Sequence, residues 1–291
     1  MVAPLQESSV PNDNAEQIAE WNGALGQRWA ESQRETDAVV AAFGQAALQR
    51  AAAQPGERVI DIGCGCGDTS LELARRVGEG GRVLGVDVSR PMLEVARARA
   101  AAAGLRQLDF DEADASAAPL PVGSDLLYSR FGVMFFADPV AAFVHLRAAL
   151  RPGGRLVFVC WRAPRDNAWA MAPLMAARRA LGITPPPADP LAPGPFAFAD
   201  GERTRSILAD AGFAAIELQR VDAPIRIGAT PREAAEAAVR LGPTARLVRE
   251  VGTDHLPAIL QGIERELASQ AAADGQVSLG GSTWLVSGAV P

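Results

Sequence analysis

Short runs of branched apolar residues alternate along this chain with longer stretches in which apolar residues recur at helical spacing. Val59, Ile60 and Ile62 form one such run, interrupted only by Asp61, which is typical of a buried parallel strand. Similar runs predict strands at 82–87, 107–112, 124–129, 156–161, 215–222 and 278–286. Helical spacing at 89–103 and 199–212 predicts helices between them, so the pattern indicates an α/β domain.

Three glycines, Gly63, Gly65 and Gly67, follow the first strand at alternate positions and lead into a predicted helix. Glycine has no Cβ, so it adopts positive φ and leaves room for a ligand beside the backbone. Asp68, Thr69 and Ser70 come next and are expected to cap the helix, whose free N–H groups favour a nucleotide-like ligand. The spacing is G-x-G-x-G and lacks the third glycine of the dinucleotide-binding G-x-G-x-x-G turn.

Asp87 closes the second predicted strand, 20 residues after Gly67. A carboxylate at the end of this strand can accept hydrogen bonds from both hydroxyls of a ribose. The predicted site is therefore a glycine turn beside a ribose-binding acid.

Five stretches in order, VIDIGCGCGDTS, VLGVDVSRPML, DEADASAAPLP, SDLLYSRFGVMFFADP and LRPGGRLVFV, give the chain a family resemblance over roughly residues 58 to 160. It resembles the class I S-adenosylmethionine-dependent methyltransferases, of the broad group that includes the ubiquinone and menaquinone C-methyltransferases. The resemblance implies a Rossmann-like, seven-stranded, mostly parallel sheet whose last strand is antiparallel, with helical insertions after strands 5 and 6. It also implies S-adenosyl-L-methionine as the cofactor.

The resemblance carries over cofactor roles residue by residue. The three glycines admit the cofactor, Asp61 helps to hold its amino-acid part, Asp87 binds the ribose, and Asp114 with Ala115 recognises the adenine amino group. Ser129 and Arg130 would lie beside the sulfonium. The remaining candidate cofactor contacts are Trp29, in a segment resembling an N-terminal lid, and Val88 and Met92 near the start of the next helix; for Trp29 and Met92, plain packing is an equal alternative.

The predicted division of the chain is an N-terminal helical lid at 1–55 and a methyltransferase domain at 56–291. Two stretches outside the common core, 163–198 and 224–274, are expected to be cap insertions. Ligands of α/β sheets bind beyond the C-terminal ends of the strands, so an insertion after strand 5 should cover the acceptor pocket.

Apolar side chains after the fourth strand predict the chemistry of the methyl acceptor. Neither the Asn/Asp-Pro-Pro-aromatic motif of amino-group methyltransferases nor the Pro-Cys nucleophile of cytosine C5 methyltransferases occurs there. We expect a small, largely apolar or aromatic acceptor, methylated at oxygen or carbon, in a pocket lined by Phe131, Met134, Phe135, Trp161 and Trp169.

Other readings of the function remain open at this point. They are a peptide or protein methyltransferase with an open docking groove, and a regulatory protein that binds the cofactor without turnover. A nicotinamide-dependent dehydrogenase is disfavoured by the missing glycine. His255 is the one candidate catalytic base singled out, with a surface-loop histidine as the alternative, and carboxylates in the insertions compete for the same role without a ranking among them. His145 is expected on the solvent side of its helix.

Composition narrows the classes of partner and chemistry. The net charge is −6, with no basic block, which argues against nucleic acid as a partner. The chain has no lysine, so Schiff-base and P-loop lysine chemistry are excluded. Cys64 and Cys66 lack metal-site spacing and no metal is expected. With no signal-peptide or membrane-spanning run, we expect a cytoplasmic protein; the oligomeric state stays open.

Overall fold

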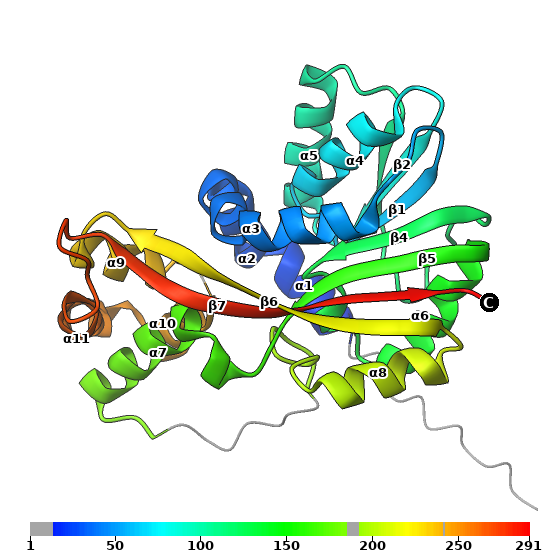
Figure 1. Ribbon diagram of the computed structural model, residues 1–291. Helices are drawn as coiled ribbons and strands as arrows, with labels where there is room; N and C mark the ends of the chain where they lie inside the picture. Colours follow the sequence, from blue (N-terminus) through cyan, green and yellow to red (C-terminus); the bar gives the residue numbers. More distant parts are fainter. Residues whose placement is uncertain (1–13, 185–191, 241) are drawn as a thin grey trace, which may run out of the picture.

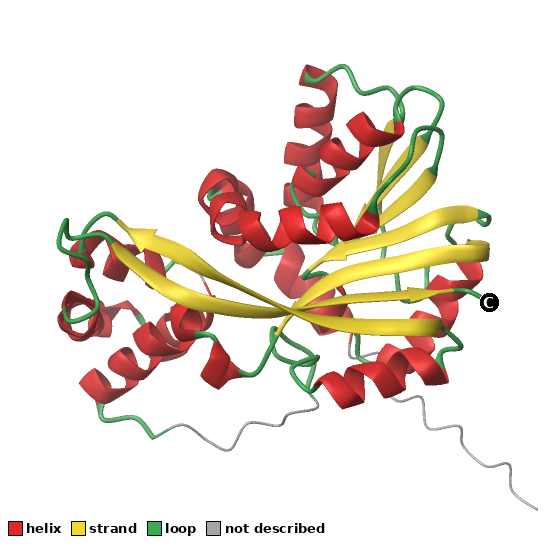
Figure 2. Cartoon of the chain, in the orientation of Figure 1, coloured by secondary structure: helices red, strands yellow, loops and turns green. Residues whose placement is uncertain are grey.

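A seven-stranded sheet forms the centre of the computed structural model, which describes residues 14–184, 192–240 and 242–291 (Figures 1 and 2). The strand order is β3-β2-β1-β4-β5-β7-β6. β1 to β5 are parallel, and β7 runs antiparallel to both β5 and β6. The strands are β1 (Arg58–Ile62), β2 (Arg82–Asp87), β3 (Leu108–Glu112), β4 (Ser124–Arg130), β5 (Leu150–Trp161), β6 (Ala214–Gly228) and β7 (Val277–Ala289). The predicted fold class is confirmed, including the antiparallel strand.

β1 lies inside the sheet, between β2 and β4, and it carries apolar side chains on both of its faces. Val59, Ile60 and Ile62 are each at most 2% exposed. In register, Ile60 lies between Leu84 of β2 and Leu127 of β4. Burial on both sides is the expected environment of a parallel strand between two others, and it fixes the position at which the glycine turn leaves the sheet.

Helices of the N-terminal half and of the crossovers flank the sheet (Figure 2). They are α1 (Asn14–Asn22), α2 (Ala24–Glu31), α3 (Gln33–Ala51), α4 (Asp68–Val77), α5 (Arg90–Ala102), α6 (Pro139–Ala149) and α8 (Gly201–Asp210). Asp138 caps α6 by accepting from the Ala141 N–H at 3.0 Å, and Pro139 occupies the first turn.

Helix α4 begins differently from the prediction. Gly67, with φ +77°, is its N-cap, and no side chain caps it. The hydroxyls of Thr69 and Ser70 donate instead to Asp61. The predicted capping role of Asp68, Thr69 and Ser70 is therefore wrong: the two hydroxyls bond to the buried Asp61 carboxylate, and the Asp68 carboxylate pairs with Arg99 and Arg130.

A second apolar cluster lies at the far end of two long strands (Figure 1). β6 continues past its predicted end at 222 to Gly228, and it pairs with β7 as far as Val277. This ribbon reaches a group of helices that we call the cap: α7 (Ala168–Leu181), α9 (Pro231–Ala238), α10 (Gly242–Val251) and α11 (Leu256–Ala268). The expected second insertion thus starts after β6, because residues 224–228 are strand. Parts of the expected lid (1–13) and first insertion (185–191) lie outside the described residues.

His145 corrects a smaller expectation. It was expected to face solvent, but it is half-buried and its Nε2 lies 2.8 Å from the Ala118 carbonyl oxygen. The loop between β3 and β4 packs back onto α6, and helical periodicity alone carries no information about that loop.

Candidate active site

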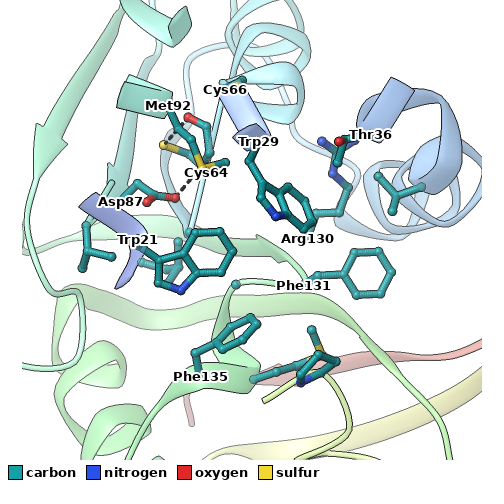
Figure 3. A pocket seen from close by; sticks show the side chains of 18 of the residues that line it. Trp21, Trp29, Thr36, Cys64, Cys66, Asp87, Met92, Arg130, Phe131 and Phe135 are labelled. Carbon is teal, nitrogen blue, oxygen red and sulfur yellow. Dashed lines mark hydrogen bonds between the residues drawn. The ribbon is translucent and has the colours of Figure 1, made fainter. Parts of the chain in front are cut away.

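One cavity, of about 250 Å³, lies where β1, β2, β4 and β5 end, beneath α1 to α3 and the cap (Figure 3). Its floor comes from the glycine turn and the ends of the strands. Its roof includes Trp169, Phe196 and Pro243. Most of the sequence-predicted site residues line it: Trp29, Gly63, Gly65, Asp87, Val88, Met92, Asp114, Ala115, Arg130, Phe131, Met134, Phe135, Trp161 and Trp169.

The glycine turn needs glycine for two separate reasons. Gly63, Gly65 and Gly67 have φ of +65°, +54° and +77°. A Cβ on Gly63 would also lie 2.6 Å from the Cα of Gly132, so two backbone segments pass each other without side chains. Gly67 supports the turn from behind and does not line the cavity.

Asp87 ties the end of β2 to the glycine turn. Its Oδ2 accepts from the Gly65 N–H and its Oδ1 from the Ser89 N–H, both at 2.8 Å. Burial raises the pKa of Asp87, and the bonds from Ser89 and Gly65 act in the opposite direction. Each carboxylate oxygen keeps a second lone pair, so the group can still accept from a ligand's hydroxyls.

Asp114 lines the cavity at the end next to β3. Its Oδ1 accepts from the backbone and hydroxyl of Ser116, at 2.9 and 2.7 Å. Its Oδ2 accepts from the side-chain amide of Asn14, the first described residue of α1. Asn14 also lines the cavity, so α1 closes this end.

Two predicted residues lie behind the cavity wall. Asp61 is fully buried and accepts from Thr69 Oγ1 and Ser70 Oγ at 2.8 and 2.6 Å, while its Oδ1 has no partner among the described residues. Burial raises its pKa to about 6, against the opposing hydrogen bonds. Ser129 donates to the Ile62 carbonyl at 2.7 Å and accepts from the Gly132 N–H at 3.1 Å, which fastens Gly132 against the glycine turn.

Arg130 belongs to a four-residue charge network. It donates to Asp37 at 2.8 Å and to Asp68 at 2.9 Å. Arg99 pairs with the same two carboxylates at 3.3 and 3.1 Å and donates to the Cys66 carbonyl at 2.8 Å. The two positive and two negative charges balance, and the network joins α3, α4, α5 and β4 around the glycine turn.

One part of the cavity is aromatic. Phe131 stacks on Trp161 with ring centroids 4.3 Å apart and planes 15° apart, and Trp161 lies 4.8 Å from Trp169. Phe131 has φ +63°, a left-handed conformation that is strained for a bulky residue, and such strain is found preferentially at functional sites. Trp169 Nε1 donates to Asn167 Oδ1 at 3.2 Å, which fixes the indole of the roof.

Helices α1 and α2, which belong to the segment expected to form a lid, also line the cavity. Trp29 lines the cavity as expected, and so does Trp21, which contacts both Trp29 and Phe135 edge-on at 5.7 and 5.6 Å (Figure 3). Asn22 donates to the Val88 carbonyl at 2.7 Å, and Ser89 Oγ donates to the Trp21 carbonyl at 2.8 Å. These bonds fasten the lid to the start of α5.

Gly26 decides how closely α2 approaches α5, and substitution by alanine should loosen the lid. A Cβ there would lie 1.9 Å from the Trp21 carbonyl oxygen and 2.6 Å from Ser89 Oγ. Although alanine favours helix over glycine, this overlap should weaken lid closure by about 1–3 kcal/mol. Hydrogen exchange of residues 14–31 measures it. Gly23→Ala is the control, because its Cβ would meet backbone only at 3.3 Å; unchanged exchange in Gly26→Ala would contradict this account.

His255 lies away from the site. It is exposed, in the short 3₁₀ turn Thr253–His255 before α11, and it does not line the cavity. The cavity instead includes residues that the sequence interpretation did not single out, among them Asn14, Gln33, Thr36, Asp37 and Gly132. Gln33, Thr36 and Asp37 share one helix face at i, i+3 and i+4, a pattern that could have identified them.

Two searches of the described ranges gave no result. In residues 14–184, 192–240 and 242–291, no group of three or more His, Cys, Asp or Glu side chains is arranged to hold a metal ion. Over the same ranges, no helix combines the length and apolarity required to cross a membrane.

Comparisons with known proteins bear on this site. Residues 59–154 match the family described as "Methyltransferase domain". The chain is 40% identical over 116 residues to a demethylmenaquinone methyltransferase from Thermus thermophilus, 39% over 104 residues to the aklanonic acid methyltransferase DauC from a Streptomyces species, and 32% over 134 residues to a nocamycin O-methyltransferase from Saccharothrix syringae. These alignments cover 40%, 35% and 45% of this chain and 52%, 47% and 48% of the relatives, so the chain spans about half the length of the relatives it matches.

Solved structures support the fold. The YcgJ protein from Bacillus subtilis superposes with a TM-score of 0.57 at 19% identity, covering 85% of this chain and 97% of that one. A putative methyltransferase from Bacillus halodurans gives 0.56 at 18% identity, covering 85% and 98%. The matched family, the strand order and the turn between β1 and α4 agree with one another. The resemblance to the class I S-adenosylmethionine-dependent methyltransferases is confirmed over residues 59–154, which match a methyltransferase domain, and the strand order agrees with it.

Proposed function

We propose that this protein transfers the methyl group of S-adenosylmethionine to a small, largely apolar or aromatic acceptor, at oxygen or carbon. The observation that carries the proposal is Asp87, whose carboxylate lines the cavity while both of its oxygens are oriented by backbone N–H groups. A ribose would fit here, because its two hydroxyls can donate hydrogen bonds to the remaining lone pairs of the Asp87 carboxylate.

The rest of the cavity fits an adenosyl cofactor from end to end. Asp114 and Ala115 would meet the adenine, the side-chain-free turn at Gly63 and Gly65 leaves room along the backbone, and Arg130 lies toward the amino-acid end. The sulfonium supplies an activated methyl group. The protein therefore contributes chiefly orientation and exclusion of water, and orientation accounts for about 7–11 kcal/mol of a barrier when the geometry is good.

The roof favours a small acceptor over a docked peptide. Trp169, Phe196 and Pro243 cover the aromatic end, and Phe131 and Trp161 offer flat apolar surfaces below them. The relatives' names point the same way, since they refer to demethylmenaquinone, aklanonic acid and nocamycin. We expect phenols and enols to be methylated, with S-adenosylhomocysteine released from the cofactor as the measured product. Turnover with nucleic acids or highly charged metabolites alone would overturn this part of the proposal.

Replacing Asp87 by alanine tests the cofactor assignment directly. The ribose hydroxyls would lose their hydrogen bonds to a charged acceptor, which should weaken S-adenosylmethionine binding about 10- to 100-fold. Isothermal titration calorimetry measures this change. Asp109→Ala is the matched control, because Asp109 is an exposed acid on β3 outside the cavity. Equal affinities of the wild-type protein and Asp87→Ala would remove the ribose assignment.

A further inference from the structure

A second cavity shares no lining residue with the candidate active site. It measures about 990 Å³ and lies where β1 and β2 begin, whereas the active-site cavity lies where these strands end. The last turns of α5, the connection that follows them and β3 line one part of it, and the start of β4 lines another. Its volume falls within the range of pockets that hold small molecules, about 300–1,000 Å³.

The cavity is open because the crossover from β3 to β4 places no helix on this face of the sheet. Residues 113–123, all of them described, form only bends, turns and extended chain. Phe110 of β3 packs beside α4 and α5, but Asp109 and Asp111 point to the other face, where they are exposed, and Leu84 of β2 is only half-buried there. Parallel strands are normally covered on both faces, so this uncovered face leaves room for a ligand.

Four arginines line the second cavity, which we call the arginine groove: Arg58, Arg82, Arg97 and Arg106. Arg58 and Arg82 are register partners on β1 and β2, so two like charges lie side by side. Like charges in this position destabilise a sheet. Within residues 14–184, 192–240 and 242–291, none of the four forms an ion pair with a carboxylate, so the groove holds positive charge that its own side chains leave without a direct counter-charge.

Backbone carbonyl groups hold two of these guanidinium groups in place. Arg82 donates to the Arg106 carbonyl oxygen at 3.2 Å, and Arg97 donates to the Phe110 carbonyl oxygen at 3.1 Å. A guanidinium has five N–H donors, so each of the two keeps donors for a further partner. The groove therefore offers cations that are already oriented, which lowers the entropic cost of binding an anion.

The groove is opposite in charge to the protein as a whole. Its four arginines and the two carboxylates of Asp109 and Asp111 give it a charge of +2, in a chain whose net charge is −6. Guanidinium forks match the oxygens of a phosphate, and a phosphate monoester carries about −1.5 to −2 at neutral pH. Half-buried Leu84 and Leu105 offer apolar contact to the remainder of such a ligand.

We propose that the arginine groove is a binding site for a phosphate monoester, with the phosphate between Arg58 and Arg82. Binding would supply the counter-charge that these two neighbours lack. The site goes beyond methyl transfer, because none of its residues lines the active-site cavity. The monoester belongs either to a soluble metabolite or to the headgroup of phosphatidic acid.

Phenyl phosphate is a probe with both a monoester and an apolar body. Titration calorimetry at low ionic strength should show saturable binding to the wild type, and Arg58→Gln should weaken it about 10-fold through loss of charge-assisted hydrogen bonds. Arg75→Gln is the matched control, because Arg75 is an exposed arginine of α4 outside the groove, and its affinity should equal that of the wild type. The Tm of ligand-free Arg58→Gln should equal or exceed that of the wild type, since a like-charged neighbour is removed.

Vesicles distinguish the two sources of the phosphate. Sedimentation of the wild type, but not of Arg58→Gln, with phosphatidylcholine vesicles that contain phosphatidic acid assigns the site to the lipid headgroup. Binding of phenyl phosphate without such sedimentation assigns it to a soluble ester. The proposal is overturned if the wild type binds neither probe saturably, if Arg58→Gln binds phenyl phosphate as the wild type does, or if Arg75→Gln loses as much affinity as Arg58→Gln.

Discussion

Gly63→Ala should be among the most damaging single substitutions in this protein, lowering the free energy of unfolding by about 2–5 kcal/mol. Alanine in the left-handed region costs about 1–2 kcal/mol, and Gly63 has φ +65°. Its Cβ would also lie 2.6 Å from the Gly132 Cα, a backbone atom held in place by Ser129. Overpacking of this kind costs typically about 1–3 kcal/mol. Urea unfolding followed by circular dichroism measures the sum.

A matched glycine separates the two contributions. Gly182, at the end of α7, has the same φ of +65°, and a Cβ there would meet nothing within 4 Å. Gly182→Ala should therefore show the conformational cost alone. Gly132→Ala should show the contact cost alone, because Gly132 has φ −80° and its Cβ would lie 2.6 Å from the Ile62 carbonyl oxygen. If Gly63→Ala is no worse than Gly182→Ala, the close approach of the two backbones is not the reason for glycine.

Asp61→Asn should remove a pH-dependent contribution to the free energy of unfolding, on the order of 3 kcal/mol across the range in which Asp61 titrates. Burial raises the pKa of Asp61 to about 6 from 3.8. The folded state therefore binds a proton more tightly than the unfolded state, so the stabilisation is complete below about pH 4 and is lost as pH rises through 6. Asparagine does not titrate, so the stability of the variant relative to the wild type should rise across this window. Unfolding free energies at pH 4 and pH 7.5 measure it.

The sign of that slope is what identifies Asp61. The amide of an asparagine changes the free energy of unfolding by an amount that is the same at every pH, so it contributes no slope with pH. Asp222→Asn is the control: the Arg220 hydrogen bond holds the pKa of Asp222 below its ordinary value of 3.8, so the relative stability of that variant should change only below about pH 4 and should stay flat between pH 4 and pH 7.5. A flat difference for Asp61→Asn would mean that the carboxylate is ionised without penalty.

The central part of the fold could be predicted because its elements are marked locally. β1, the glycine turn and Asp87 each have a residue pattern that a single strand–turn–helix unit explains. The register that brings Asp87 to Gly65 follows from parallel pairing of β1 with β2, where Ile62 lies beside Val86. Most of the predicted cofactor residues therefore line one cavity.

The rest depends on contacts between distant segments, which leave little trace in local sequence. Even across the single turn between β1 and α4 the local pattern misled, because Thr69 and Ser70 look like helix caps but donate to Asp61 on the preceding strand. The extension of β6 to Gly228 was missed because its burial depends on the cap. His255 was selected because histidine suits a general base and because it lies near a helix start in the expected second insertion, and only coordinates show that its turn is exposed and away from the cavity.

The pairing of Gly228 with Val277 at the tip of the β6–β7 ribbon gives the molecule a modular layout. Helices α9 to α11 leave and re-enter the sheet through two adjacent residues, so the chain between them can lengthen, shorten or diverge without displacing a strand. Residues 229–230 and 272–274 beside this pair are exposed, and chain insertions at exposed loops are the ones that folds tolerate best. Under the proposed function, the segment between residues 228 and 277 is where we expect acceptor preference to change, while the turn between β1 and α4 and the strands around it stay unaltered.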